Sequence, residues 1–215
     1  MGNVVMPDIS HWETVTSWKK LKEEVPFIIF KGTQRCDYID PKAYETIVKC
    51  EEYKIPYWIY AFVEKGGELE QAKFLVKTFK PYVNDSKYFC GWCIDAEDKK
   101  VNNDEEVLRA LKYLEGSGKW KVILYTMYAQ RDKLLNSIQY ATRKDKITWW
   151  EARYGIDNGK YNALFQPHKG VDFHQYTSKG SLPYIKGDVD LNRLTGTLDR
   201  SWFTETLYMR RNGQS

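Results

Sequence analysis

The sequence has no long apolar run, few histidines and little net charge. None of its hydrophobic stretches approaches the roughly 18–20 residues that span a bilayer, which excludes a transmembrane helix. The segment Met1–Val5 shows no basic region followed by an apolar core, so no secretory signal peptide is visible. Three histidines argue against a zinc enzyme. A net charge of +4 is too small to indicate a nucleic-acid-binding protein.

Cysteine is also sparse, and the four that occur do not form a recognisable site. Cys90 and Cys93 form a C-x-x-C motif, but neither Cys36 nor Cys50 lies at a spacing that would complete a zinc site. The motif lies in a strand-like run, whereas a thioredoxin-type pair opens a helix. Residues three apart on a strand should point to opposite faces. We therefore expect four reduced, buried thiols without a shared function.

Aromatic residues, in contrast, are abundant, with 8 Trp, 16 Tyr and 9 Phe among 215 residues. This content excludes a disordered chain. The length suits one domain whose core needs no disulfide or metal to be stable. No linker or low-complexity tract interrupts the chain. We expect one domain over residues 1–215, with a core over about 4–196 and a short closing segment over 197–215.

Strand and helix patterns alternate along most of the chain. Apolar runs rich in β-branched and aromatic residues predict eight strands: Val4–Ile9, Phe27–Lys31, Ile55–Phe62, Tyr88–Ile94, Lys121–Thr126, Ile147–Arg153, Val171–Tyr176 and Asp188–Leu191. Five stretches with helical spacing separate the early strands, and after the sixth strand the gaps are too short for a long helix. The sequence therefore predicts an irregular, TIM-like parallel (β/α) barrel of type (βα)5β3, without helices in its C-terminal third. Leu198–Arg211 is predicted to form a closing helix.

Acidic residues gather at the carboxyl ends of three predicted strands. Asp8 ends the first strand, Asp95 and Glu97 end the fourth, and Asp190 lies in the last. In barrels of this kind the chemistry takes place at that end, and the first and last strands meet when the barrel closes. A single acid there is commonly a solvated loop residue or a helix cap. Four acids on one rim favour an active site.

Asp95 and Glu97 are the most informative pair. Residues i and i+2 of a strand share a face and lie roughly 7 Å apart, so their ionised carboxylates repel each other and one pKa should rise. A carboxyl that keeps its proton near neutral pH can donate it to a leaving oxygen. Composition alone does not separate a glycosidase from a divalent-metal hydrolase, because Asp and Glu also bind hard cations.

Short motifs along the chain add a family resemblance. They are Asp8-Ile9-Ser10, Lys31-Gly32-Thr33, Tyr57-Trp58-Ile59-Tyr60-Ala61, Asp95-Ala96-Glu97, Leu124-Tyr125-Thr126, Trp150-Glu151-Ala152-Arg153-Tyr154, Gln175-Tyr176 and Val189-Asp190-Leu191-Asn192. In this order they resemble glycoside hydrolase family 25, the Chalaropsis-type lysozymes of phage endolysins and bacterial autolysins. The resemblance covers almost the whole chain, from about Val4 to Gly196.

The resemblance implies a substrate and a set of roles. The substrate would be peptidoglycan, cut at the β-1,4 bond between N-acetylmuramic acid and N-acetylglucosamine. Glu97 would be the general acid. Asp95 would stabilise the transition state or orient the 2-acetamido group of the sugar as internal nucleophile, with net retention of configuration. Asp8 and Asp190 would hold the pair through hydrogen bonds. No cofactor or metal is implied.

Other residues near the strand ends are candidates for substrate binding, because aromatic rings match the apolar faces of sugars. The candidates are Tyr60, Tyr125, Trp150, Tyr154, Gln175 and Arg153. Trp149 and Trp150 are adjacent on one strand, so only one of them can face inward, and the motif favours Trp150. Arg153 would contact an anionic substituent of the substrate or pair with an acid of the rim.

Three positions depart from the family pattern. The family often has Gln where this sequence has Glu13, an acid where it has Gln34, and Trp where it has His174. None of the three belongs to the set of four acids. The departures therefore concern the shape of the substrate groove and leave the chemistry intact.

Two alternatives stay open at this point. One is a non-catalytic peptidoglycan-binding module on the same barrel. The other is a different barrel hydrolase, either a chitinase-like glycosidase or a metal-dependent esterase. For an active lysozyme we expect a monomer that acts on the bacterial cell wall, without nucleic-acid or membrane partners. Without a visible signal peptide, it would be released by a holin or by lysis, or be a mature extracellular domain.

Overall fold

Eight strands close into a barrel in the computed structural model, which describes residues 4–101, 104–135 and 147–213. Around the barrel the order is β1-β10-β9-β8-β7-β6-β5-β3, and pairing of β1 with β3 closes the ring. The strands are β1 (Met6–Ile9), β3 (Ile28–Gln34), β5 (Tyr57–Phe62), β6 (Phe89–Asp95), β7 (Lys121–Met127), β8 (Thr148–Ala152), β9 (Phe173–Leu182) and β10 (Ile185–Leu194). Two short strands, β2 (Thr14–Val15) and β4 (Tyr38–Ile39), pair with β10 and β3. The predicted barrel is confirmed.

The last strand runs against the predicted direction. β10 pairs antiparallel with both β9 and β1, whereas the other neighbours in the ring are parallel. Only Pro183 and Tyr184 separate β9 from β10. A connection this short permits a hairpin and excludes the crossover that a parallel strand needs. The prediction of an all-parallel barrel was therefore wrong for this strand, and the barrel is mixed.

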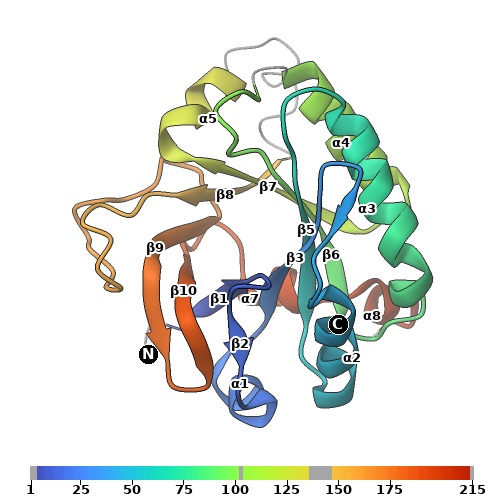
Figure 1. The fold of residues 1–215 in the computed structure, drawn as a ribbon, viewed down its shortest axis with the longest axis horizontal. Coiled ribbons are helices and arrows are strands. Elements are labelled where there is room, and N and C mark those ends of the chain that lie inside the picture. Colours follow the sequence, from blue (N-terminus) through green and yellow to red (C-terminus); the bar gives the residue numbers. More distant parts are fainter. Residues whose placement is uncertain (1–3, 102–103, 136–146, 214–215) are drawn as a thin grey trace.

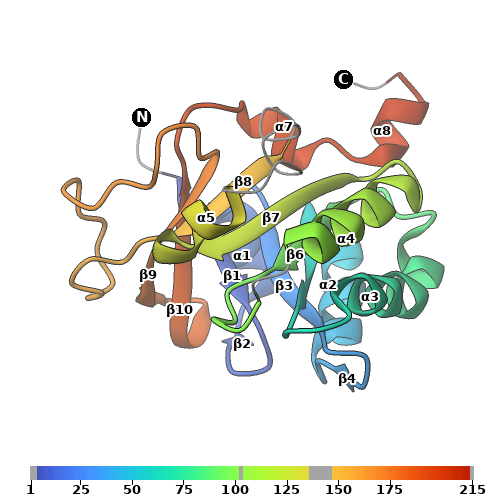
Figure 2. The same cartoon turned by 90° about the horizontal axis from the view of Figure 1, so that it is seen from above.

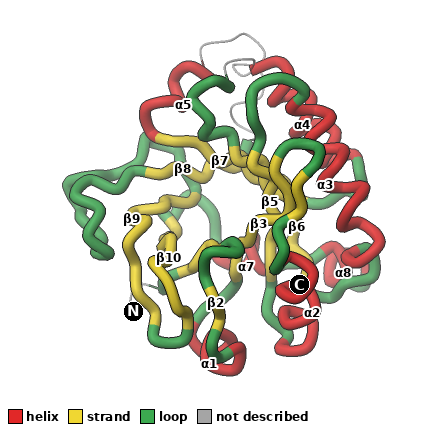
Figure 3. Tube along the Cα trace, viewed as in Figure 1, coloured by secondary structure: helices red, strands yellow, loops and turns green. Residues whose placement is uncertain are grey.

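Helices cover only part of the barrel. They are α1 (Trp18–Glu24), α2 (Ala43–Tyr53), α3 (Glu68–Val83), α4 (Asp104–Gly116) and α5 (Tyr128–Leu135). In Figures 1 and 3, α2, α3, α4 and α5 lie outside the strands from β3 to β8 and α1 lies below β2, while the β9–β10 hairpin is flanked by loops, as predicted. A large apolar cluster fills the space between helices and strands, with Leu21, Ile47, Leu75 and Leu111 among its helical members. No helix in the described ranges is long and apolar enough to cross a membrane.

The C-terminal segment plugs the base of the barrel. It forms two short helices, α7 (Arg200–Thr204) and α8 (Leu207–Arg211), because Glu205 is extended and interrupts the predicted single helix. The α7 residue Phe203 is fully buried and stacks on Phe27 with a centroid distance of 5.5 Å. Figure 2 shows α7 and α8 at the end of the barrel opposite β2 and β4. The site therefore has to lie at the other end.

The four cysteines are free thiols. Cys50 is buried as expected, but Cys36 is exposed, so the prediction of four buried thiols was wrong for Cys36. Cys90 and Cys93 both face the barrel interior instead of opposite faces. A register shift at the start of β6 causes this, next to Gly91, where a Cβ atom would lie 2.2 Å from a backbone oxygen of β7.

Candidate active site

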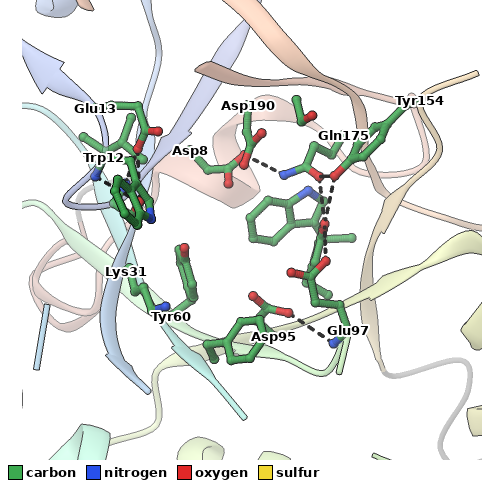
Figure 4. Close-up of a pocket in the computed structure, with 16 residues that line it drawn as sticks. Asp8, Trp12, Glu13, Lys31, Tyr60, Asp95, Glu97, Tyr154, Gln175 and Asp190 are labelled. Atoms are coloured by element: carbon green, nitrogen blue, oxygen red, sulfur yellow. Dashed lines mark hydrogen bonds between the residues drawn. The ribbon is translucent and has the colours of Figure 1, made fainter. Parts of the chain in front are cut away.

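A cavity of about 340 Å³ opens at the barrel end where the parallel strands terminate (Figure 4). All four predicted acids line it, together with five of the six predicted binding residues: Tyr60, Tyr125, Trp150, Tyr154 and Gln175. Arg153 does not line it. Asp190 reaches this rim from the middle of the antiparallel strand β10, not from a strand end. The volume falls within the range of ligand pockets in proteins.

Asp95 and Glu97 lie on one side of the cavity (Figure 4). β6 ends at Asp95, whose Oδ1 accepts the backbone N–H of Glu97 at 3.2 Å. Glu97 Oε2 lies 3.3 Å from the hydroxyl oxygen of Tyr125, whose single hydrogen has Gln175 Oε1 as a nearer acceptor at 2.7 Å. Burial raises the pKa of both carboxyls, and the charge of Glu97 raises that of Asp95 further, while Lys31 opposes both shifts. The pair can therefore retain a proton at a pH where free carboxyls have lost theirs.

Asp8 and Asp190 face each other on neighbouring strands, as direct partners in the β1–β10 register. Asp8 Oδ2 accepts Nδ2 of Asn192 at 2.6 Å and Nε2 of Gln175 at 3.0 Å. Burial raises the pKa of Asp8 to about 7. Burial and the nearby charge of Asp8 raise the pKa of Asp190 to about 9. Asp190 therefore keeps its proton at neutral pH and donates it in a hydrogen bond to Asp8.

A chain of hydrogen bonds connects the two acidic pairs. Gln175 Oε1 accepts the hydroxyls of Tyr125 at 2.7 Å and Tyr154 at 2.6 Å, and its Nε2 donates to Asp8. Because its two ends have different partners, the amide of Gln175 has one favourable orientation. The connection runs from Glu97 through Tyr125 and Gln175 to Asp8. It fixes the side chains on this wall of the cavity before any ligand binds.

The opposite wall contains residues that the sequence did not single out for binding. Lys31 Nζ donates to Gln34 Oε1 at 2.6 Å and lies 4.9 Å from the centroid of the Phe62 ring. Gln34 in turn donates to Glu64 at 2.7 Å. Burial lowers the pKa of Lys31, although the surrounding acids counteract this. The Lys-x-Thr motif at the end of β3 was the signal that could have assigned Lys31 to the site.

Trp12 stands at the rim of the cavity with 78% of its surface exposed. Its ring lies 4.4 Å from the ring of His11, measured between centroids. The backbone N–H of His11 bonds to the buried carboxylate of Asp40 at 3.0 Å, and its Nδ1 to the same oxygen at 2.9 Å. Glu13, a departure from the family pattern, accepts the backbone N–H of Ser10 at 2.7 Å. The loop that presents Trp12 is thus held by side chains on both sides.

Trp150 and Arg153 differ from the expectations for groove residues. Trp150 lines the cavity floor but is only 2% exposed, and its Nε1 donates to Asn192 at 2.7 Å. Trp149 faces the helix layer, as predicted. The guanidinium of Arg153 lies 3.8 Å from the ring centroid of Tyr128, outside the cavity lining. Arg153 therefore stabilises the loop after β8 and is not brought together with the acids of the rim.

His174, where the family often has Trp, is fully buried beside the site. Its Nε2 bonds to the carbonyl oxygen of Arg153 at 3.0 Å. A carbonyl oxygen only accepts, so Nε2 carries the hydrogen. Burial lowers the pKa of His174 to about 4, and the ring is neutral at physiological pH. At the position of the usual Trp, His174 thus forms a polar link to the backbone just after the neighbouring strand β8.

A closed α/β barrel with buried carboxyls and tyrosines around one mouth defines a class of glycan-cleaving barrels. The family model "Glycosyl hydrolases family 25" matches residues 7–185, and the chain belongs to this family. The protein is therefore a glycoside hydrolase, as the order of motifs predicted. No protein with a curated function matches the sequence.

Several solved structures resemble the chain. The catalytic domain of endolysin ply40 from the Listeria monocytogenes bacteriophage P40 is 26% identical, with a TM-score of 0.75 over 90% of this chain and 94% of that domain. The Streptococcus pneumoniae virulence factor GHIP, a glycosyl hydrolase 25, is 19% identical, with a TM-score of 0.77 over 93% and 92%. A Streptomyces coelicolor lysozyme is 17% identical, with a TM-score of 0.70 over the full length of both chains.

Proposed function

We propose that the protein is a lysozyme that cleaves the β-1,4 bond between N-acetylmuramic acid and N-acetylglucosamine in bacterial peptidoglycan. The observation that carries the proposal is the position of Asp95 and Glu97 in one buried cavity of a family 25 barrel. The similarity to a phage endolysin domain and to a bacterial lysozyme supports the proposal that peptidoglycan is the substrate. The catalytic domain would span the chain, with 4–196 as its core and 197–215 as its closing segment.

In the proposed reaction Glu97 donates a proton to the glycosidic oxygen. Burial raises its pKa, which keeps the proton available, and the Tyr125 hydroxyl orients its carboxyl group. Asp95 stabilises the positive charge that develops on the sugar ring, or orients the 2-acetamido group so that its oxygen attacks the anomeric carbon. The second route gives net retention of configuration. In either case the leaving sugar takes the proton of Glu97, and a water molecule then supplies the hydroxyl of the new reducing end and returns a proton to the site.

Asp8 and Asp190 position this pair without touching the scissile bond. Protonated Asp190 donates to Asp8, and Asp8 accepts from the Gln175 amide that also holds Tyr125. Tyr60 and Tyr154 offer ring faces to sugars within the cavity, and Trp12 offers a third at the rim. Lys31 supplies the cation among the acids that line the cavity.

The proposed enzyme acts on the bacterial cell wall. The partner is the glycan strand of the cell wall, and the enzyme works as a monomer without nucleic-acid or membrane partners. Release by a holin or by lysis, or existence as a mature extracellular domain, would bring it to the wall.

Replacement of Glu97 by Gln tests the assignment of the general acid. The amide retains the shape of the side chain but cannot donate the proton, so turnover of purified sacculi should fall at least about a hundredfold with a melting temperature no lower than that of the parent. Glu70→Gln on the surface of α3 is the matched control and should keep the parental rate. Parental lysis by the Glu97→Gln enzyme would refute the role of Glu97. A parent protein that binds sacculi without releasing reducing ends would instead support the non-catalytic module.

A further inference from the structure

The peptide groups of Glu97 are held by side chains, because β6 ends two residues before it. The N–H of Glu97 donates to Asp95 Oδ1 at 3.2 Å. Its carbonyl oxygen accepts Nε2 of Gln130 at 2.7 Å. Just before Glu97, bonds to the neighbouring strands hold the chain: Val63 N donates to the carbonyl of Asp95 at 2.9 Å, and Ala96 N donates to the carbonyl of Tyr125 at 3.0 Å. The direction of the Glu97 side chain therefore depends on Gln130 as well as on the strand.

Gln130 is half-buried, and the oxygen of its amide is fully buried without a partner in the described residues. Only the amide nitrogen can donate to a carbonyl, so the other end of the amide, Oε1, has its orientation fixed as well. Oε1 is buried, and no group in the described part of the chain donates to it. A buried acceptor without a partner destabilises the fold. An apolar side chain of the same length would avoid that cost, so the donor function accounts for a glutamine here.

The helix that carries Gln130 is anchored near the cavity. α5 begins directly after β7, and the ring of its first residue, Tyr128, stacks on His168 with a centroid distance of 3.9 Å. His168 Nδ1 lies 2.8 Å from the buried carboxylate of Glu151 on β8, and Arg131 Nε lies 3.7 Å from the same group. These contacts fix the first turn of α5 against β8 and the loop after it. Gln130 thus lies on a helix whose first turn packs against residues of β8 and of the loop after it.

We propose that Gln130 is a positioning residue that aims the carboxyl group of Glu97 into the cavity by holding its backbone carbonyl. The inference rests on the proposed role of Glu97 as proton donor. Gln130 is absent from the cavity lining, so its effect on the reaction passes through the Glu97 backbone. A displacement of about 1 Å of a catalytic group is enough to slow a reaction strongly. Loss of the bond should therefore reduce kcat and leave substrate binding intact.

The test replaces Gln130 by Met, which has a similar length and no donor. We expect kcat on peptidoglycan to fall at least tenfold, with KM within twofold of the parent and a melting temperature equal to or above it. Gln130→Glu is the second variant in case the Met variant does not fold. It retains the shape but loses the N–H, and should show the same loss of kcat above the pKa of the introduced carboxyl. A kcat within twofold of the parent in a folded variant would overturn the proposal.

Lys80→Met is the matched control. Lys80 on α3 also donates a side-chain N–H to a backbone carbonyl, that of Ser117 at 2.6 Å in the loop before β7, and neither residue lines the cavity. This variant should therefore keep the parental kcat. If Glu97→Gln retains parental turnover, the proposed function fails. If Glu97→Gln is inactive and Gln130→Met is fully active, only the positioning role fails.

Discussion

Asp190 faces Asp8 across the β1–β10 ladder, and ionisation of both carboxyls in this buried site is costly. The proton stays on Asp190 because Asn192 and Gln175 both donate to Asp8 and stabilise its ionised form. The hydrogen bonds around the two aspartates thus determine which of them keeps the proton. The sequence alone indicated that the acids share a rim but not which of them is protonated.

The pKa shift of Asp190 predicts a stability that depends on pH. The folded pKa of about 9 lies above the unfolded value of 3.8, so the contribution to stability is complete below about pH 4 and is lost as the pH rises toward 9. Asn at this position cannot ionise but still donates to Asp8. Asp190→Asn should therefore increase the free energy of unfolding by at least about 1 kcal/mol at pH 8 and leave it unchanged at pH 4. Urea titration at the two pH values measures the difference.

Asp188→Asn provides the control for this prediction, since Asp188 lies on the same strand and forms an exposed ion pair with Lys179. It should change the free energy of unfolding by less than about 1 kcal/mol at either pH. An Asp190→Asn variant that is no more stable than the parent at pH 8 would show that Asp190 is ionised in the folded protein.

Individual side chains were predictable where the strand alternation determines their direction. Asp95 and the Trp149–Trp150 pair follow this rule, because Asp95 lies beyond the register shift at the start of β6 and both Trp residues lie in β8, which pairs without a shift. Trp12 and Lys31 were missed as binding residues for different reasons. The loop that presents Trp12 is shaped by a contact to Asp40, 28 positions further along the chain, and the position of Lys31 was noted only as part of a motif.

At the scale of elements, the strands and the order of helices were predictable from periodicity, but strand direction was not. The predicted start of the last strand at Asp188 missed Ile185–Gly187, which hid how short the connection to β9 is. Glycine and lysine in that segment look like a loop in the sequence. The hairpin forms because β10 closes the barrel against β1, a contact between distant parts of the chain.

The helix α7 is a second element whose role only the structure reveals. Phe203 contacts Phe27 and Phe173 inside the barrel, and its carbonyl accepts Nε1 of Trp58 at 2.9 Å. Phe203→Ala should lower the free energy of unfolding by about 3–5 kcal/mol, because it leaves a cavity at the barrel base. Chemical denaturation measures the effect, with the exposed Ser201→Ala as control, expected within about 0.5 kcal/mol of the parent. A loss below about 1 kcal/mol would contradict the role of α7 as a plug.

At the scale of the whole molecule, the small net charge conceals an uneven distribution. The cavity alone holds five carboxyl groups, from Asp8, Glu13, Asp95, Glu97 and Asp190, against the single ammonium of Lys31. A chain with a net charge of +4 must then carry its excess of bases elsewhere. That arrangement suits attraction to an anionic cell wall while the catalytic mouth stays acidic.

The central claim concerns the bond that the enzyme cuts, and mass spectrometry of the products tests it most directly. Purified peptidoglycan is digested with the parent enzyme, the new ends are reduced with borohydride, and the fragments are identified. The account predicts that the new reducing ends are muramic acid, recovered as muramitol, and that they are absent after digestion with Glu97→Gln. Fragments that end in reduced N-acetylglucosamine would contradict the assignment as a muramidase.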